Sequence, residues 1–229
     1  MSLLNPTQRA RSNSAIDRQA PVHNAGRSSE PAVLADIYKE DTNIAIWRRQ
    51  LSEPLQHIVS DFVDSRKQPY LSCIVTPNDA RSVIRDGLGS SSFTELGEDI
   101  SELVDMFCYL FDLSRAGLRL TVLRETMCPK FHVDHVPCRM VTTYLGVATE
   151  WLPHHLVNRE RLGLASTGQS DQESGIYSST DHIQSMACGD VALLKGETWQ
   201  GNQDAGLVHR SPAVSPGQSR LLLTLDFGN

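Results

Sequence analysis

Long hydrophobic runs are missing from this sequence. No stretch approaches the roughly 18 to 20 apolar residues that a membrane-spanning helix needs, so we expect no membrane partner. The first residues, Met1 to Pro6, lack the basic region followed by an apolar one that marks a secretory signal, which predicts a cytoplasmic protein. Basic residues do not outnumber acidic ones either, with 21 Lys and Arg against 27 Asp and Glu. The net charge of −6 favours neither nucleic acid nor an anionic membrane as a partner.

Cysteine is scarce and irregularly placed. The chain has five cysteines, an odd number without regular spacing. This count does not fit a disulfide framework and predicts a reducing compartment. Nothing in the sequence fixes the oligomeric state.

Two regions of different composition divide the chain. Residues 1–32 are polar, with arginines among Ser, Asn, Gln and Pro, and predict a disordered tail; an organellar targeting peptide is the alternative. Residues 33–229 are enough for one sizeable core and predict a single jelly-roll domain. Within it, we expect a helical part at 36–115 and barrel strands over 118–229. A lid-like insertion is expected at 153–185, which is rich in Ser, Gly, Gln and charge.

Apolar periodicity locates the elements of this domain. Helical spacing predicts helices over residues 53–63 and 91–113. Apolar or alternating runs predict strands at 70–75, 118–124, 139–145, 183–186, 191–196, around Val208 and at 221–227. Helices followed by many short strands indicate an α+β protein, a jelly-roll or cupin-like barrel with an N-terminal helical buttress.

A histidine and a carboxylate two residues apart are the first candidates for a metal site. Chance alone gives roughly 0.6 His-x-Asp triplets in a chain of this composition, so His132 and Asp134 say little by themselves. On an extended strand, however, both side chains project from one face and can reach one ion. His209 follows a strand start, and Arg220 comes after a Pro/Gly/Ser-rich turn that would fold the last strand back beside His209. We therefore expect a metal site with a guanidinium nearby.

These residues carry two resemblances. The order His-x-Asp, distal His and following Arg resembles the signature of Fe(II)/2-oxoglutarate-dependent oxygenases, whose fold is a double-stranded β-helix. A closer resemblance is to an uncharacterised bacterial domain family often placed near zinc-homeostasis genes, which brings no established activity. It rests on four motifs, Cys-Pro-Lys-Phe-His-Val-Asp at 128–134, Thr-Glu-Trp-Leu at 149–152, Lys-Gly-Glu at 195–197 and His-Arg-Ser-Pro at 209–212.

The oxygenase resemblance implies a role for each of the four residues. His132, Asp134 and His209 would be the Fe(II) ligands, since two imidazoles and one carboxylate can take one face of an octahedral ion. Arg220 would hold the distal carboxylate of 2-oxoglutarate through two parallel hydrogen bonds. The implied reaction is hydroxylation of a small-molecule or peptide substrate whose identity the sequence does not give.

Further candidates are weaker. Tyr144 and Thr142, which alternate on the strand after the motif, are candidates for hydrogen bonds to the cosubstrate. Trp151, Trp199 and Lys195 are candidates for a substrate pocket, although Trp is common in protein cores.

Cys128 and Cys138 lie on either side of the metal motif and leave a zinc site open. Thiolate, imidazole and carboxylate suit Zn²⁺, although this spacing is not a familiar zinc motif. A zinc-binding protein of zinc homeostasis is therefore the second hypothesis. A cupin-like binding or isomerase module that keeps the metal without 2-oxoglutarate is the third, and a barrel with a vestigial site is the fourth.

Overall fold

The structure is a computed structural model that describes residues 23–65, 70–163 and 168–228. It is mixed α and β, with two β-sheets at its centre. The larger sheet has seven strands in the order β1-β2-β8-β5-β10-β4-β3. Their bounds are Asn24–Ser28 (β1), Thr42–Trp47 (β2), Tyr70–Val75 (β3), Ala116–Leu123 (β4), Cys138–Leu145 (β5), Val191–Lys195 (β8) and Arg220–Phe227 (β10).

Strand β10 joins the two halves of the larger sheet. It is antiparallel to β4 along its whole length, from Arg220 opposite Leu123 to Phe227 opposite Ala116. Its other edge is antiparallel to β5, so β10 is paired on both sides. Only β1 and β2 are parallel among the described neighbours.

The smaller sheet has three antiparallel strands in the order β7-β6-β9. They are Glu150–Leu152 (β6), Gln184–Ser185 (β7) and Val208–Arg210 (β9). The segment between β6 and β7, predicted as a lid-like insertion, contains short helices rather than only loop. These are η3 His154–Leu156, η4 Arg159–Arg161, α4 Asp171–Ser174 and η6 Thr180–His182.

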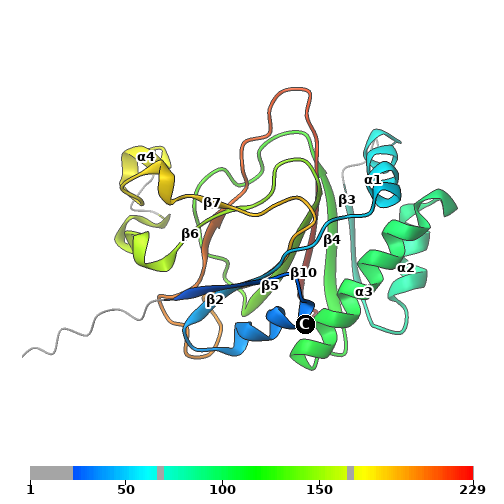
Figure 1. Cartoon of the computed structure of the whole chain (residues 1–229), viewed down its shortest axis with the longest axis horizontal. Helices are drawn as coiled ribbons and strands as arrows, with labels where there is room; N and C mark the ends of the chain where they lie inside the picture. Colours follow the sequence, from blue (N-terminus) through cyan, green and yellow to red (C-terminus); the bar gives the residue numbers. More distant parts are fainter. Residues whose placement is uncertain (1–22, 66–69, 164–167, 229) are drawn as a thin grey trace, which may run out of the picture.

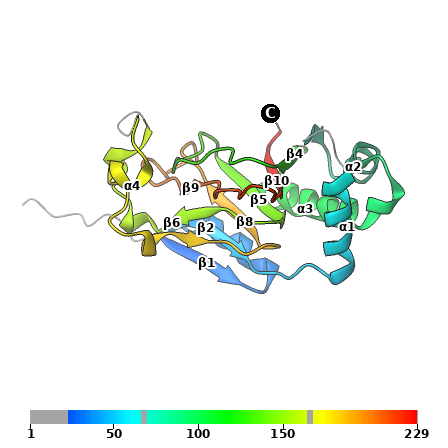
Figure 2. The ribbon, with the colours of Figure 1, turned by 90° about the horizontal axis from the view of Figure 1, so that it is seen from above.

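Helices cover the face of the larger sheet that is turned away from the smaller one. They are η1 Pro31–Tyr38, α1 Glu53–Ser65, α2 Ala80–Leu88, η2 Ser91–Phe93 and α3 Thr94–Phe111. Helices α1 to α3 lie on one side of the molecule and α4 with β6 and β7 on the other (Figures 1 and 2). Helix α3 buries the apolar stripe that its periodicity predicts against the sheet, namely Leu96, Ile100, Leu103, Val104 and Phe107.

A second apolar cluster fills the space between the two sheets. It joins residues of the larger sheet such as Ile44, Val141 and Leu194 to Trp151 of the smaller one. Burying the apolar surface of this cluster stabilises the contact between the two sheets by about 25 cal/mol for each Å² removed from water. The site described below lies at the same interface.

Two expectations about the N-terminal half need correction. The predicted tail at 1–32 falls partly outside the described residues, but residues 24–28 form β1 and η1 begins at Pro31. Strand β1 has no alternating apolar pattern, and its backbone pairs with β2. The predicted helical part at 36–115 also contains β2 and helix α2, neither of which was predicted, whereas β3 matches the strand predicted at 70–75.

Among the described residues, no helix is long and apolar enough to cross a membrane. All five cysteines are described and none forms a disulfide.

Candidate metal centre

Two backbone segments bring the site together. His132 lies in the loop between β4 and β5, and His209 lies on β9. The two residues form one antiparallel bridge, in which each backbone N–H donates to the other residue's carbonyl at 3.0 Å. His132 is therefore extended locally as predicted, but it belongs to an isolated bridge rather than to a named strand.

The side chains of His132, Asp134 and His209 converge. One ligand atom from each lies within 4.8 Å of the others. His209 Nε2 is 3.4 Å from Asp134 Oδ2, and His132 Nε2 is 3.7 Å from Asp134 Oδ1. The side chains of Asp134 and His209 are only 13% and 9% exposed, whereas His132 is 37% exposed. The cluster is thus open on the side of His132.

Both imidazole rings are held by a backbone carbonyl at Nδ1. His132 Nδ1 lies 2.9 Å from the carbonyl oxygen of Lys130, and His209 Nδ1 lies 3.2 Å from that of Leu207. A carbonyl can only accept, so it selects the tautomer with the proton on Nδ1. Both Nε2 atoms lie beside Asp134, and each can offer its lone pair to a metal ion once its ring is neutral.

The charges of the cluster suit a cation. Burial would by itself raise the pKa of Asp134, but its hydrogen bond with His209 and the nearby His209, Arg139 and His132 lower that pKa to about 2. Burial, followed by the charge of His209, lowers the pKa of His132. At neutral pH the cluster therefore holds an ionised carboxylate beside a neutral imidazole of His132, the protonation states that bind metals.

The loop carrying Asp134 is fixed by backbone contacts with Gly196. Gly196 N–H donates to Pro137 O at 2.8 Å, and Glu197 N–H donates to Asp134 O at 3.0 Å. A Cβ at residue 196 would collide with the Val136 carbonyl and lie 2.8 Å from that of Asp134. The Lys-Gly-Glu motif thus positions the loop through its glycine.

A buried carboxylate braces both histidine segments. Asp171 Oδ2 accepts from Phe131 N–H at 3.1 Å and from Arg210 Nη1 at 2.9 Å. The Arg210 guanidinium lies over the Phe131 ring, 4.3 Å from its centroid, and also donates to Glu150. Because Phe131 precedes His132 and Arg210 follows His209, the insertion that carries Asp171 supports the cluster. Sequence reasoning missed this residue.

Arg220 is a buried cation without a carboxylate partner. The residue is 1% exposed, and among the described residues no acid lies within ion-pair distance of it. Its guanidinium donates to Ser211 Oγ at 3.0 Å and, through Nη2, to Thr143 and Thr149 at 3.2 and 2.8 Å. Its Nε is buried and unpaired. Burial lowers the pKa of Arg220 to about 10.

A cavity of about 80 Å³ is lined by both histidines and by two of the residues that hold Arg220. Thr149 and Ser211, which hold Arg220, line it together with His132 and His209. The other lining residues come mainly from β4, β5, β10 and the loop before His132; they are Arg119, Thr121, Met127, Cys128, Arg139, Val141, Arg210, Leu222 and Thr224. Two of the three predicted ligands, His132 and His209, therefore border the same space as hydroxyl groups that hold Arg220, whereas Asp134 and Arg220 do not line it themselves.

The two secondary candidates on β5 face away from this cavity. Tyr144 is buried against the helical layer, where its hydroxyl donates to Asp99 at 2.5 Å, and Thr142 Oγ1 has no partner. Thr143, between them, contacts Arg220 instead. The prediction placed Thr142 and Tyr144 on the face of β5 that is turned to the metal site, but that face carries Thr143. The polar Arg139 shares this face with Thr143 and is the sequence signal that could have identified it.

The candidates for a substrate pocket lie elsewhere. Trp151 is buried between the sheets with Arg27 over its ring. Trp199 and Lys195 line a separate cavity of about 550 Å³, in which Lys195 Nζ lies 5.0 Å from the Trp199 ring centroid. None of the three borders the cavity at the histidines.

The cysteines do not join the cluster. Cys138 is fully buried in the core on the helical side of β5, and burial raises the pKa of its thiol strongly. Cys128 lines the cavity, but the described group that can hold a metal contains no thiol.

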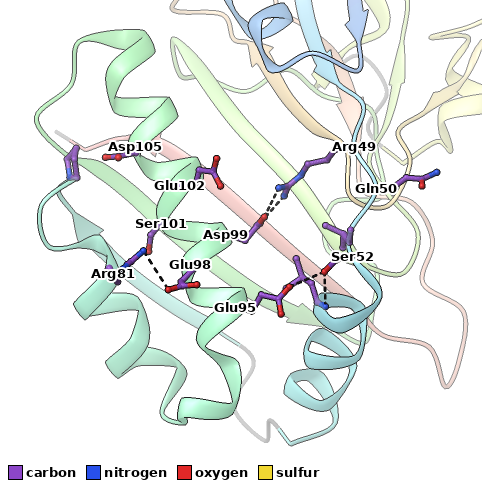
Figure 3. A pocket seen from close by; sticks show the side chains of 13 residues that line it. Arg49, Gln50, Ser52, Arg81, Glu95, Glu98, Asp99, Ser101, Glu102 and Asp105 are labelled. Carbon is purple, nitrogen blue, oxygen red and sulfur yellow. Dashed lines mark hydrogen bonds and ion pairs between the residues drawn. The ribbon is translucent and has the colours of Figure 1, made fainter.

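A larger cavity lies along α3, away from the histidines. It has a volume of about 650 Å³ and an acidic wall that includes Glu95, Glu98 and Glu102. Asp99 in this wall is paired with Arg49, and Ser52 donates to Glu95 (Figure 3). Its carboxylates belong to one helix face and do not form a described metal group.

Comparisons with solved structures return oxygenases at low identity. A dioxygenase for auxin oxidation from rice is 12% identical, with a TM-score of 0.48, over 90% of this chain and 82% of that one. An oxygenase of Shewanella oneidensis, described as putative, is 12% identical, with a TM-score of 0.47, over 90% and 89%. The 2-oxoglutarate complex of the Arabidopsis thaliana dioxygenase for auxin oxidation is 9% identical, with a TM-score of 0.44, over 90% and 92%.

Identities of 9 to 12% and TM-scores of 0.44 to 0.48 do not show which chemistry this chain performs, and only its own side chains bear on that question. No curated protein sequence matches it. The model of one family, described as a protein of unknown function (DUF1826), matches residues 28–226, and the chain therefore belongs to the DUF1826 family.

Proposed function

We propose that this protein is an Fe(II)- and 2-oxoglutarate-dependent oxygenase that hydroxylates a small molecule or a peptide. One observation carries the proposal. A cluster of two histidines and one aspartate, oriented for metal binding, borders the same small cavity as the hydroxyl groups that hold an uncompensated buried arginine.

The cluster fits a divalent ion. Two neutral imidazoles, each offering Nε2, and an ionised carboxylate are the ligand set that non-haem Fe(II) sites use, with further positions open for other groups. The carbonyls of Lys130 and Leu207 supply the second layer of hydrogen bonds that fixes ligand orientation. His132, Asp134 and His209 would hold the ion.

Arg220 fits an anionic ligand. Burying an unpaired cation costs several kcal/mol, and that cost is offset when a carboxylate binds it. Its unpaired Nε adds an unsatisfied donor, the group that a carboxylate oxygen accepts from. A dicarboxylate spanning the metal and Arg220 would meet Thr149 and Ser211 on the way.

The reaction follows from these two sites. When bound, Fe(II) with 2-oxoglutarate and O2 would supply oxidative decarboxylation to succinate and CO2, coupled to hydroxylation of a C–H bond. The chain's part is to orient the metal ligands, to bind the distal carboxylate at Arg220 and to restrict water in a narrow cavity. Met127, Val141 and Leu222 give that cavity apolar walls.

The fold and location are part of the proposal. The two facing sheets are proposed to be the two halves of a double-stranded β-helix, with α1 to α3 as its buttress. Five cysteines without a disulfide support a reducing, cytoplasmic environment.

Metal content and cosubstrate turnover test the proposal together. The full chain is loaded anaerobically with Fe(II) or Zn²⁺, and succinate formation from 2-oxoglutarate is measured after air is admitted. We expect one Fe(II) per chain and slow succinate formation even without a primary substrate. Both should be abolished in His132→Ala. His135→Ala is the matched control, because His135 lies in the same loop with a side chain that is 81% exposed.

The outcomes separate the alternatives. Stoichiometric zinc with no effect of 2-oxoglutarate would favour the zinc-binding hypothesis, and iron without 2-oxoglutarate binding would favour a cupin-like module. Retention of metal by both His132→Ala and His209→Ala would refute every version of the site.

A further inference from the structure

Arg139 joins the metal cluster to a second carboxylate on the last strand. Its Nη1 donates to Asp134 Oδ2 at 2.7 Å. Its Nε and Nη2 donate to the two oxygens of Asp226 at 2.7 and 3.0 Å. The side chains of Arg139, Asp226 and Asp134 are 23%, 27% and 13% exposed, so all three are largely screened from water.

The sheet itself fixes this pair. Leu225 of β10 lies opposite Met140 of β5, which makes Asp226 and Arg139 the next positions along the antiparallel ladder. The bidentate contact with Asp226 also fixes the plane of the guanidinium. Arg139 therefore presents Nη1 to Asp134 from a rigid support.

We propose that Arg139 and Asp226 form a charge-neutral pair that positions Asp134 to bind a divalent cation. The inference rests on the proposed metal role of Asp134. By holding Oδ2, Arg139 limits rotation of the carboxylate and leaves Oδ1 on the side of His132. Arg139 is a positioning residue, because it acts through Asp134.

The neutrality of the pair is as important as its hydrogen bonds. A lone guanidinium beside a metal cluster repels a cation and competes with it for Asp134. Asp226 cancels this charge through two hydrogen bonds, so Arg139 can orient the carboxylate without opposing metal binding. Removal of Arg139 as well should therefore restore part of the metal affinity that removal of Asp226 alone costs.

Co(II) titration of the full chain without oxygen provides the test, since the visible spectrum of Co(II) reports both affinity and coordination geometry. We expect Arg139→Gln to weaken binding by about 10 to 100 fold and to change the spectrum. Asp226→Asn should weaken it at least as much, because it leaves the charge of Arg139 uncompensated. The double variant should bind Co(II) more tightly than Asp226→Asn alone.

Arg49→Gln is the matched control. Arg49 makes the same type of bidentate contact with Asp99, at 2.6 and 2.9 Å, with side chains 13% and 15% exposed. That pair lies beside α3 in the other cavity (Figure 3). Its loss should lower the melting temperature and leave the Co(II) affinity within about twofold of the wild type.

The possible failures can be distinguished. A wild type that binds no Co(II) overturns the proposed function and this inference together. A wild type that binds Co(II), with Arg139→Gln binding equally well, overturns this inference alone. It is also overturned if Arg49→Gln weakens binding as much as Arg139→Gln, or if the double variant binds more weakly than Asp226→Asn.

Discussion

Replacing Arg220 with Met tests whether the buried cation is a binding group for a carboxylate. Burial lowers the pKa of its guanidinium from the ordinary arginine value to about 10. At about 1.36 kcal/mol per pKa unit, the folded protein holds this charge at a disadvantage of roughly 3 kcal/mol. The substitution removes that disadvantage but also removes three hydrogen bonds, to Ser211, Thr143 and Thr149, worth about 1 kcal/mol each. The two effects nearly cancel, so the free energy of unfolding without ligand should change by about 1 kcal/mol or less.

Ligand-dependent thermal unfolding is the assay. The protein is loaded with Mn(II) in the absence of oxygen and melted with and without 2-oxoglutarate. A ligand at 100 times its Kd stabilises the folded state by about 2.7 kcal/mol, which corresponds to about 5 to 10 °C for a chain of this size. We expect this shift in the wild type and a shift below about 2 °C in Arg220→Met.

Arg119→Met is the control for this experiment. Arg119 lines the same cavity from β4, but it is exposed and no described contact fixes its guanidinium. Its substitution should leave the 2-oxoglutarate shift intact. An undiminished shift in Arg220→Met would refute the carboxylate role. A loss of more than about 3 kcal/mol without ligand would indicate a structural arginine instead.

Three further perturbations address other parts of the site. Gly196→Ala should destabilise the fold by about 1 to 3 kcal/mol and weaken metal binding, because its Cβ presses on the loop of Asp134; urea unfolding and Co(II) titration measure the two effects. Thr143→Val should raise the KM for 2-oxoglutarate, whereas Thr142→Val should not, since only Thr143 contacts Arg220; steady-state kinetics distinguish them. Burial, with the charges of neighbouring bases, lowers the pKa of His154 to about 4. The unfolded chain therefore takes up the proton first, and stability is lost as the pH falls from 6.5 towards 4. After a discount for partial exposure, His154→Gln should remove about 1 kcal/mol of this loss between pH 7 and pH 5, measured by urea unfolding.

Each of these perturbations has its own control. Gly117→Ala should be tolerated, because the nearest atom to a Cβ at residue 117 is 3.7 Å away. Equal KM values for Thr143→Val and Thr142→Val would contradict the assignment of the β5 faces. His57→Gln is the control for His154→Gln, because His57 is exposed on α1 and is not among the groups that lower the pKa of His154. An unchanged pH profile in His154→Gln would show that other groups cause the loss.

The sequence predicts those elements whose residues carry a strong period. The stripe of α3 and the alternation of β4 are examples, since each follows from burial of one face. Strand β1 has no such stripe and depends on pairing with β2, a long-range contact that local residues do not encode. Helix α2 was missed because it has only nine residues and a glycine, Gly87, that fits closely against Leu71.

The metal-ligand candidates could be predicted from the sequence because metal binding requires particular residue types. His, Asp and Arg in a specific order stand out from the sequence, and the structure brings His132, Asp134 and His209 together. The residues that support them are ordinary ones. Asp171 lies in an insertion with little periodicity, and nothing in its sequence neighbours indicates that it contacts Phe131.

The two faces of β5 show that the pairing register decides which of its residues reach the site. Thr142 and Thr143 are identical in type, and a shift of one residue exchanges the two faces of a strand. In the observed pairing Leu222 lies opposite Thr143 and Leu225 opposite Met140, with an irregularity between Leu221 and Leu222. The same register places Thr143 beside Arg220 and Arg139 beside Asp226. The pairing of β5 with β10 thus fixes the position of Arg220, which would bind the cosubstrate. It also fixes the position of Arg139 and Asp226, the pair that would orient the metal ligand. A slip of that ladder would separate the two functions while leaving every ligand in the sequence unchanged.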